Sequence, residues 1–205
     1  VCGLRDHVPD SRARSIGGSP VIADIGCGSG AIGLSVAKHC PNARVILTDI
    51  SADALQVAKT NAASLGLVEH GPGGPSSRNG KEGRVTFLHG DLLEPLLVRE
   101  VRDLDVVASN PPYIPAGEMA NFPPEVRREP SSALDGGEGG LFYITQLAAE
   151  SGLFLRPGGM LIFEIDDGQA RAVLEMLKGS GWKDPKILPD LAGRGRVARG
   201  FRSKA

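Results

Sequence analysis

The stretch VIADIGCGSGAIG, residues 21–33, decides the fold of this chain. Its first five residues form an apolar run that predicts a short buried strand, and residues 31–38 carry the apolar spacing of a helix packed on a sheet. The glycine-rich turn between them, residues 26–30, is called the glycine loop below. A buried strand, a glycine loop and a helix in this order are typical of a parallel β-sheet that binds ligands at the carboxyl ends of its strands.

The alternation of strand and helix continues along the chain. Further strands are predicted at residues 44–48, 84–88, 105–108, 159–165, 186–188 and 197–201, and helices at residues 52–65, 140–152 and 169–178. Near-continuous apolar strands separated by helices indicate a mostly parallel sheet covered on both faces. We therefore predict a Rossmann-like α/β fold with a seven-stranded sheet. Residues 1–20 are expected to form a loose lead-in, residues 21–205 one domain, and residues 68–83 a flexible surface insertion.

Composition and charge exclude several classes of protein. Of the 205 residues, 41% are hydrophobic and 23% charged, which is typical of a globular domain and not of a disordered or fibrous chain. The 23 Lys and Arg residues balance 24 Asp and Glu residues, so a net charge of −1 gives no reason to expect stable nucleic-acid binding or an anionic membrane partner. Since the sequence shows neither an apolar run of transmembrane length nor a signal peptide, we expect a cytoplasmic protein, or one of the mitochondrial matrix in a eukaryote.

The cysteines and histidines do not form a metal-binding pattern. Cys2, Cys27 and Cys40 are widely spaced, and none of them pairs with a histidine at the interval typical of metal ligands. We therefore expect reduced thiols and no bound metal.

The glycine loop fits two nucleoside-binding patterns. Gly28, Gly30 and Gly33 match the dinucleotide fingerprint G-x-G-x-x-G. Gly26, Gly28 and Gly30 match a looser G-x-G-x-G turn that lies against the sugar and methionine portion of a nucleoside. In both patterns Asp49, at the end of the second strand, can accept hydrogen bonds from two ribose hydroxyls. Glycines between a strand and a helix also serve packing, so this motif alone leaves the ligand open.

Acidic residues near the glycine loop favour the second pattern. Asp24 precedes the first glycine by two residues and places a carboxylate beside the ligand, which suits a cationic sulfonium and has no clear use against a pyrophosphate. Asp91 and Leu92 follow the third predicted strand, where the carboxylate can accept a hydrogen bond from an adenine amino group while the leucine packs on the ring.

Residues 110–113, Asn-Pro-Pro-Tyr, follow the fourth predicted strand directly and are called the NPPY segment below. Pro111 and Pro112 hold the backbone rigid and leave the Pro111 carbonyl as a fixed acceptor, and Asn110 adds a side-chain carbonyl beside it. Two converging acceptors can hold a planar NH₂ group, and Tyr113 can stack on its plane. The segment therefore predicts a site that orients an amide or exocyclic amine nitrogen toward an electrophile.

The motifs DIGCGSGAIG, TDIS, HGDLLEP and SNPPYI together resemble the class I S-adenosylmethionine-dependent methyltransferases that modify planar nitrogens. Residues 123–144 and 189–200 narrow the resemblance to the release factor glutamine methyltransferases, the PrmC/HemK family. It implies transfer of a methyl group from S-adenosyl-L-methionine to the glutamine N5 of the Gly-Gly-Gln motif in peptide chain release factors, with S-adenosyl-L-homocysteine as product.

The resemblance also implies roles for particular residues. It assigns Gly26, Gly28, Gly30 and Asp49 to the cofactor, and Asn110, Pro111 and Tyr113 to the glutamine amide as the catalytic residues. Together with the residues argued from position above, the predicted cofactor residues are Asp24, Gly26, Gly28, Gly30, Asp49, Asp91, Leu92 and Asn110. A release factor is the expected partner, and ribosome association is left open. The helical N-terminal domain typical of the family is expected to be absent, which puts affinity for a protein substrate in question.

Other functions remain open from the sequence. A DNA or RNA amino-methyltransferase acting on adenine N6 or guanine N2 can use the same NPPY segment, and the fold can also serve a catalytically weak subunit that needs a partner. An NAD-dependent oxidoreductase is disfavoured by the NPPY segment. The charged residues 125–129 are either a lid or an exposed loop. A basic series near the C-terminus (Arg194, Arg196, Arg199 and Arg202) either contacts RNA or a release factor, or is solvated.

Overall fold

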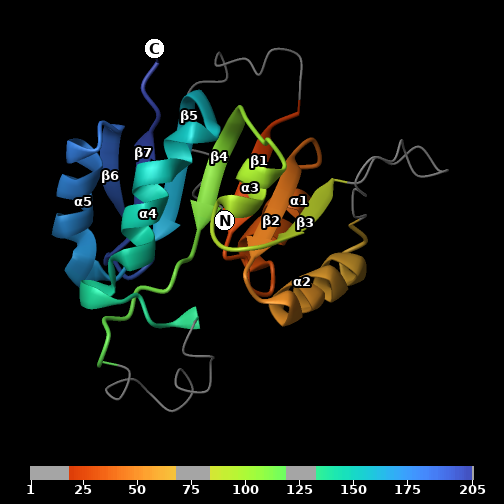
Figure 1. Cartoon of the computed structure of the whole chain (residues 1–205), viewed down its shortest axis with the longest axis horizontal. Helices are drawn as coiled ribbons and strands as arrows, with labels where there is room; N and C mark the ends of the chain where they lie inside the picture. Colours follow the sequence, from red (N-terminus) through yellow and green to blue (C-terminus); the bar gives the residue numbers. More distant parts are fainter. Residues whose placement is uncertain (1–18, 68–83, 119–132, 205) are drawn as a thin grey trace.

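The apolar run at residues 21–25 forms β1 (Val21–Ile25), an interior strand of the sheet. The computed structural model describes residues 19–67, 84–118 and 133–204 (Figure 1). The predicted insertion at residues 68–83, most of the lead-in and the charged residues 125–129 therefore lie outside the described residues.

The described residues follow the predicted order of strands and helices. The elements are β1, α1 (Ala31–His39), β2 (Arg44–Asp49), α2 (Ala52–Ser64), β3 (Val85–His89), α3 (Glu94–Val98), β4 (Leu104–Ser109), α4 (Phe142–Glu150), β5 (Leu155–Glu164), α5 (Ala170–Gly179), β6 (Lys183–Pro189) and β7 (Gly195–Phe201). Short 3₁₀ helices lie at Glu138–Gly140, Ser151–Leu153 and Asp167–Gln169 and are labelled η5, η6 and η7.

The sheet confirms the predicted seven-stranded, mostly parallel architecture within the described residues. Its strand order is β3-β2-β1-β4-β5-β7-β6. The first five strands in this order pair in parallel, and β7 runs antiparallel to both of its neighbours. The strand order reverses between β1 and β4, which is the switch point where ligands of open α/β sheets bind.

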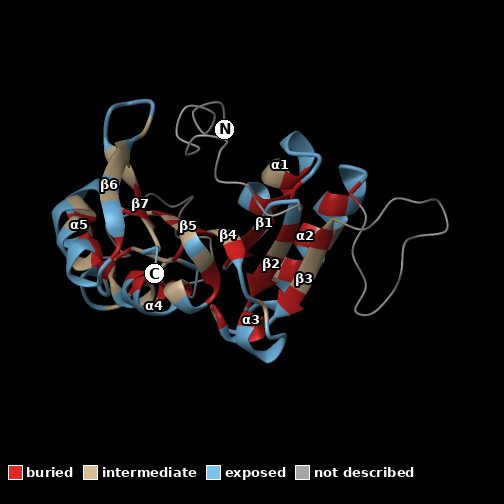
Figure 2. Cartoon of the chain, turned by 90° about the horizontal axis from the view of Figure 1, so that it is seen from above, coloured by how far each residue is buried: buried red, intermediate tan, exposed pale blue. Residues whose placement is uncertain are grey.

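Helices cover both faces of the sheet, as predicted. Ile22 on β1 packs in one apolar cluster with Leu34 of α1 and Leu55 of α2. Ile25, on the opposite face of the same strand, packs in a second cluster that includes Ile144 of α4. This alternation follows from the two-residue period of a strand. Seen from above, α1 lies on one side of the strands, with α3 and α4 on the other (Figure 2).

Two elements differ from the sequence prediction. β5 begins at Leu155 and not at residue 159, because the fully buried Leu155 pairs with Leu104 before a register shift leads to the pair Met160 and Val106. α3 was not predicted, since it is only five residues long and contains a proline. Proline is tolerated in the first turn of a helix, where its missing N–H is not needed.

Candidate active site

The four loops that carry the predicted site residues leave the sheet at one level. Ile25 at the end of β1 pairs with Thr48 of β2 and with Ser109 of β4. Asp49 pairs with His89 at the end of β3. The strand register therefore brings the glycine loop, Asp49, residues 90–92 and the NPPY segment together at the carboxyl edge of the sheet, as the sequence predicts.

Side chains and backbone groups tie these loops to one another. The Ser109 hydroxyl donates to the Ile25 carbonyl at 2.8 Å, which joins the ends of β4 and β1. The Thr48 hydroxyl donates to the Leu92 carbonyl at 3.1 Å, and the Gly90 N–H donates to the Asp49 carbonyl at 3.0 Å. These two hydrogen bonds connect the loop after β2 to the loop after β3. In the loop after β3, Leu92 adopts a positive φ of 42°.

The glycines of the loop have two different reasons to be glycine. Gly26 and Gly28 have φ values of 64° and 54°, and a Cβ built on either meets no heavy atom of residues 19–67, 84–118 or 133–204 within 4 Å. A Cβ on Gly30 would lie 2.8 Å from Cδ1 of Leu34, and one on Gly33 would lie 2.9 Å from Oδ2 of Asp24. Gly26 and Gly28 therefore keep an open space clear, whereas Gly30 and Gly33 allow α1 to pack closely.

Asp24 is a buried carboxylate beneath the glycine loop. Its side chain is 1% exposed, and Oδ2 accepts a 2.8 Å hydrogen bond from the Gly33 N–H at the start of α1. Oδ1 is equally buried and has no partner among the described residues. Burial raises the pKa of Asp24 to about 7; the Gly33 hydrogen bond opposes this shift, and the charge of Asp49 adds to it.

Asp49 holds the other side of the glycine loop. Its Oδ2 accepts from the Gly28 N–H at 2.7 Å and its Oδ1 accepts from the Ser51 N–H at 2.8 Å. Each carboxylate oxygen retains a second acceptor direction, so these bonds orient the group without exhausting it. The same aspartate is thus fixed in place at the position predicted to bind a ribose.

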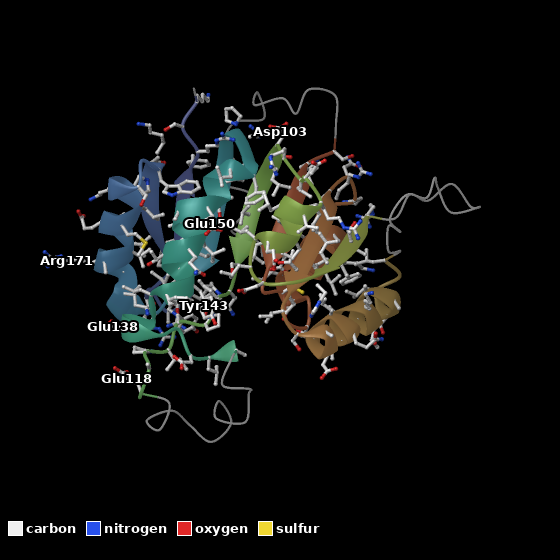
Figure 3. The ribbon with its side chains drawn as sticks, viewed as in Figure 1. Asp103, Glu118, Glu138, Tyr143, Glu150 and Arg171 are labelled. Carbon is white, nitrogen blue, oxygen red and sulfur yellow. The ribbon has the colours of Figure 1, made fainter. Side chains whose placement is uncertain are left out.

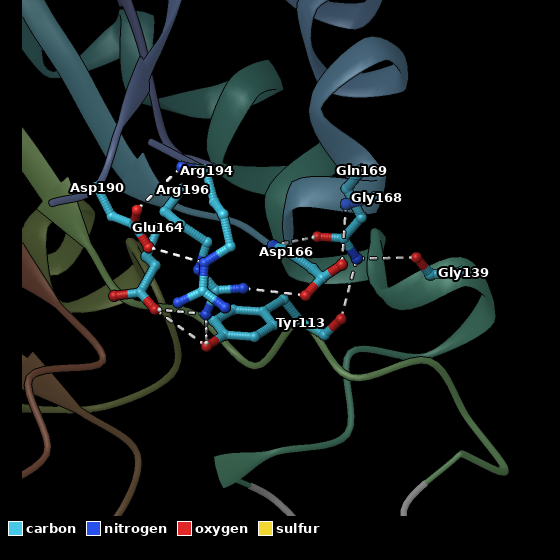
Figure 4. Close-up of polar contacts among 9 residues, drawn as sticks. All are labelled: Tyr113, Gly139, Glu164, Asp166, Gly168, Gln169, Asp190, Arg194 and Arg196. Carbon is cyan, nitrogen blue, oxygen red and sulfur yellow. Dashed lines mark hydrogen bonds and ion pairs between the residues drawn. The ribbon is translucent and has the colours of Figure 1, made fainter. Parts of the chain in front are cut away.

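The residues of the NPPY segment differ in their exposure to solvent. Asn110 is exposed just past β4, whereas Pro111 is buried. The hydroxyl of half-buried Tyr113 donates its hydrogen to Glu164 Oε1 at 3.0 Å, and the hydroxyl oxygen of Tyr113 accepts from Arg196 Nη2 at 3.0 Å (Figure 4). Burial and the charge of Glu164 raise the pKa of Tyr113, an effect that Arg196 opposes.

The backbone of the NPPY segment is held by a second set of contacts. Gln169 donates from Nε2 to the Tyr113 carbonyl at 2.9 Å and to the Gly139 carbonyl at 3.0 Å. A Cβ on Gly140 would overlap the Tyr113 carbonyl and the Gln169 amide, and one on Gly136 would lie 2.7 Å from the Pro112 carbonyl. Residues 136–140 therefore pack directly against the segment because they lack side chains.

Sequence reasoning missed Glu164, Asp166, Gln169 and the role of Arg196. The interpretation of the basic series as solvated is wrong for most of its members, whereas its contact with RNA or a release factor stays a prediction. Arg196 pairs with Glu164 and Asp166, and Arg199 is buried and pairs with Asp184. Arg202 donates to the Leu155 carbonyl. The sequence offers one signal for these residues, the acidic side chains at and just after the end of β5. It does not show that β5 pairs with β7, and only the folded structure reveals that pairing.

Other groups at this edge are less suited to chemistry. Burial raises the pKa of Cys27 far above its usual range, with Asp24 and Asp49 adding to the shift, which disfavours the reactive thiolate form. Glu118 and Glu138 lie at the same end of the molecule as the NPPY segment, opposite Asp103 (Figure 3).

No group of three or more His, Cys, Asp or Glu side chains suited to a metal ion occurs in the described part of the chain.

Known proteins match both the sequence and the fold. Residues 13–123, more than half of the chain, match the family model of the methyltransferase small domain. The chain belongs to the methyltransferase small domain family. The fold around the glycine loop and the NPPY segment is thus that of a methyltransferase small domain, and both motifs lie within the matched residues.

Relatives of this methyltransferase domain support the resemblance predicted from its motifs. It is 45% identical over 186 residues to a release factor glutamine methyltransferase of Moorella thermoacetica, covering 90% of this chain and 59% of that protein. It is 36% identical over 184 residues to the enzyme of the same name in Deinococcus radiodurans, with the same coverage. The chain thus spans about three-fifths of the length of the curated relatives it matches.

Solved structures confirm the fold. A methyltransferase from Pyrococcus furiosus matches with a TM-score of 0.62 at 18% identity, over 91% of this chain and 76% of that one. An RNA methyltransferase from Salinibacter ruber, solved with S-adenosyl-L-homocysteine, matches with a TM-score of 0.51 at 20% identity, over 91% and 82% of the two chains. Within the described residues, no helix has the length and apolar character needed to cross a membrane.

Proposed function

We propose that this chain transfers a methyl group from S-adenosyl-L-methionine to the side-chain amide nitrogen of the glutamine in the Gly-Gly-Gln motif of a peptide chain release factor. One observation carries the proposal: the pairing of Ile25 with Ser109 makes the glycine loop and the NPPY segment leave neighbouring strands side by side. A nucleoside site and an amide site then share one edge of the sheet. The names of the relatives at 36% to 45% identity support the substrate.

The residues around the glycine loop fit the cofactor. A Cβ on Gly26 or Gly28 would lie more than 4 Å from any heavy atom of the described residues. Asp24 Oδ1 is buried, has no hydrogen-bond partner in the described part of the chain, and can accept from a hydrogen-bonding ligand or face a cationic one. Asp49 is oriented by two backbone N–H groups. The residues proposed to hold the cofactor are Asp24, Gly26, Gly28, Gly30, Asp49, Asp91, Leu92 and Asn110.

The reaction needs an electrophilic methyl group, which the cofactor supplies as a sulfonium when bound. The bond from sulfur to the methyl carbon breaks, a bond from that carbon to the amide nitrogen forms, and the nitrogen loses one proton to solvent. In this proposal the Asn110 side-chain carbonyl and the Pro111 carbonyl accept the two amide hydrogens and aim the nitrogen at the methyl carbon. Tyr113 lies against the amide plane. Orientation and stabilisation of the charge that grows on nitrogen are the chain's contribution.

The test is a methyl-transfer assay on an intact release factor. The chain is incubated with S-adenosyl-L-methionine and the release factor, and the Gly-Gly-Gln peptide is then analysed by mass spectrometry. Replacement of one amide hydrogen by a methyl group is the expected result, and a release factor with Gln→Glu in that motif is the matched control. Absence of transfer to the release factor together with labelling of DNA or RNA would favour an amino-methyltransferase of nucleic acids instead.

The assay is run on this chain and on a version extended by any upstream residues of its gene. Transfer by both versions supports a domain that recognises the release factor by itself. Transfer by the extended version alone supports the partner-dependent alternative, in which other residues supply affinity for the substrate. Because release factors act where translation occurs, the proposal places the reaction in the cytoplasm, or in the mitochondrial matrix of a eukaryote.

A further inference from the structure

Arg196 contacts a residue that lies far away in the sequence. It lies on β7, yet its guanidinium reaches the tyrosine of the NPPY segment, 83 residues earlier in the sequence (Figure 4). Nη2 donates to Tyr113 Oη at 3.0 Å and lies 3.4 Å from Glu164 Oε1, while Nη1 donates to Asp166 Oδ2 at 3.0 Å. The Cζ atom lies 5.3 Å from the centroid of the Tyr113 ring. One side chain thus contacts both the hydroxyl and the ring of the tyrosine.

The partners of Arg196 are themselves fixed. Asp166 caps η7, accepting from the Gly168 N–H at 2.9 Å, and the backbone N–H of Asp166 donates to Gln169 at 3.0 Å. Gln169 in turn donates to the Tyr113 carbonyl. Tyr113 is therefore held at its hydroxyl and ring by Arg196 and at its backbone by Gln169, and both supports meet at Asp166.

The chemistry of the guanidinium group explains why position 196 holds an arginine and not a lysine. A planar guanidinium presents several donors in a fixed arrangement and can stack on an aromatic ring at the same time, which the point charge of lysine cannot reproduce. Arg196 is only 23% exposed, so solvent weakens these contacts less than it would on an open surface. Arg194, two residues earlier, is 63% exposed and pairs with Asp190 within its own turn.

We propose that Arg196 is a positioning residue for methyl transfer: by fixing Tyr113 it fixes the substrate side of the NPPY segment. This inference rests on the proposed function. Two prolines separate Asn110 from Tyr113 and limit the backbone between them, so a displaced Tyr113 shifts the two carbonyl acceptors as well. The glycine loop and Asp49 follow β1 and β2, which lie on the far side of β4 from β5 and β7, so cofactor binding is expected to stay intact.

The test compares Arg196→Met, Arg196→Lys and the matched control Arg194→Met in the release-factor assay. Arg196→Met is expected to lower kcat by about tenfold to a hundredfold, the loss typical of a small misplacement of a reacting group. The dissociation constant for S-adenosyl-L-methionine is expected to stay within about twofold. Arg196→Lys should recover part of the rate, and Arg194→Met should match the parent chain.

A double variant separates positioning from general stability. If Arg196 acts through the tyrosine hydroxyl, Arg196→Met costs less in a Tyr113→Phe background than in the parent chain, since part of the interaction is already lost. An equal loss in both backgrounds, or a loss confined to cofactor affinity, overturns the inference.

A spectroscopic readout keeps this inference distinct from the proposed function. The chain has two tyrosines, so ring signals from ¹³C-tyrosine are assigned with Tyr113→Phe. Arg196→Met should shift and sharpen the Tyr113 ring signals, with Arg194→Met leaving them in place. If the parent chain methylates no release factor, the proposed function fails while this readout still reports whether Arg196 holds Tyr113. Unchanged Tyr113 signals in Arg196→Met overturn the inference whatever the substrate.

Discussion

The glycine loop and the NPPY segment leave neighbouring strands at one level, but they are held by different parts of the chain. Asp24 bonds to Gly33 and Asp49 to Gly28, residues nine and 21 positions away. Tyr113 is held instead by Glu164, Gln169 and Arg196, at separations of 51, 56 and 83 residues. The first loop is shaped by its own strand–helix unit and by the end of the next strand, β2, and the second by the far half of the sheet.

The difference indicates that cofactor binding and substrate positioning, at the same edge of the sheet, depend on different parts of the chain. The glycine loop needs little beyond backbone turns and two carboxylates, which a short stretch of sequence supplies. The NPPY segment must place two acceptors against a protein substrate, and its supports come from β5, η7 and β7. Damage to the second set of contacts is therefore expected to reduce transfer while leaving cofactor binding intact.

The largest expected effect separates the two regions by function. Asn110→Ala removes one of the two acceptors proposed for the amide and should lower kcat by at least about a hundredfold. Because the side chain is exposed beyond β4, folding should change little. Asn110 is only one of the eight residues proposed to hold the cofactor, so cofactor affinity should fall far less than kcat. Methyl transfer by mass spectrometry and cofactor affinity by calorimetry check this. A collapse of cofactor affinity would show that Asn110 serves the glycine-loop side instead.

The second effect concerns the packing beneath the NPPY segment. Gly140→Ala forces a Cβ onto the Tyr113 carbonyl and should lower the free energy of unfolding by about 2–4 kcal/mol. Gly139→Ala is the matched control, since its φ is also positive but the nearest atom to its Cβ lies 4.0 Å away. Urea unfolding measures both. Equal losses in the two variants would mean that backbone strain alone explains the effect.

The third prediction divides the glycine loop into ligand-facing and packing glycines. Gly28→Ala places a methyl group in the open space and should weaken cofactor binding by about tenfold or more, with a stability loss of about 1–2 kcal/mol from its positive φ. Gly30→Ala meets Leu34 and should lose about 1–3 kcal/mol beyond that. Calorimetry and urea unfolding of both variants test this. If Gly30→Ala is as stable as Gly28→Ala, the assignment of the two roles is wrong.

A further effect is a pH dependence at Asp24. The pKa of about 7 in the folded chain exceeds the ordinary value of 3.8, so between these values the folded state binds a proton that the unfolded state has released. Stability from this group therefore falls as pH rises from about 4 to about 7 and then levels off. Asp24→Asn removes this component, and urea unfolding of both chains across the range measures the difference. A difference that does not vary with pH would contradict it.

Much of the fold was predictable from local patterns. The alternation of apolar strands with helices predicted the seven strands and both covering layers, because each element signals its own period. The site was predictable to the extent that its motifs follow strand ends directly, as Asp49, Asp91 and Asn110 do. The short α3 and the early start of β5 were not predictable, since α3 is brief and β5 depends on pairing with β4.

The sequence by itself determined the parallel sheet, the glycine loop and the position of the NPPY segment after β4, because these depend on residues close together in the chain. Only the tertiary structure decided which glycines face open space, which meet α1, and which side chains hold Tyr113. The support of Tyr113 depends on β7 entering the sheet antiparallel beside β5, which brings Arg196 to Glu164 and Asp166. Contacts across 51 to 83 residues leave no local signal, so Arg196 could not be distinguished from its solvated neighbour Arg194 until the chain was folded.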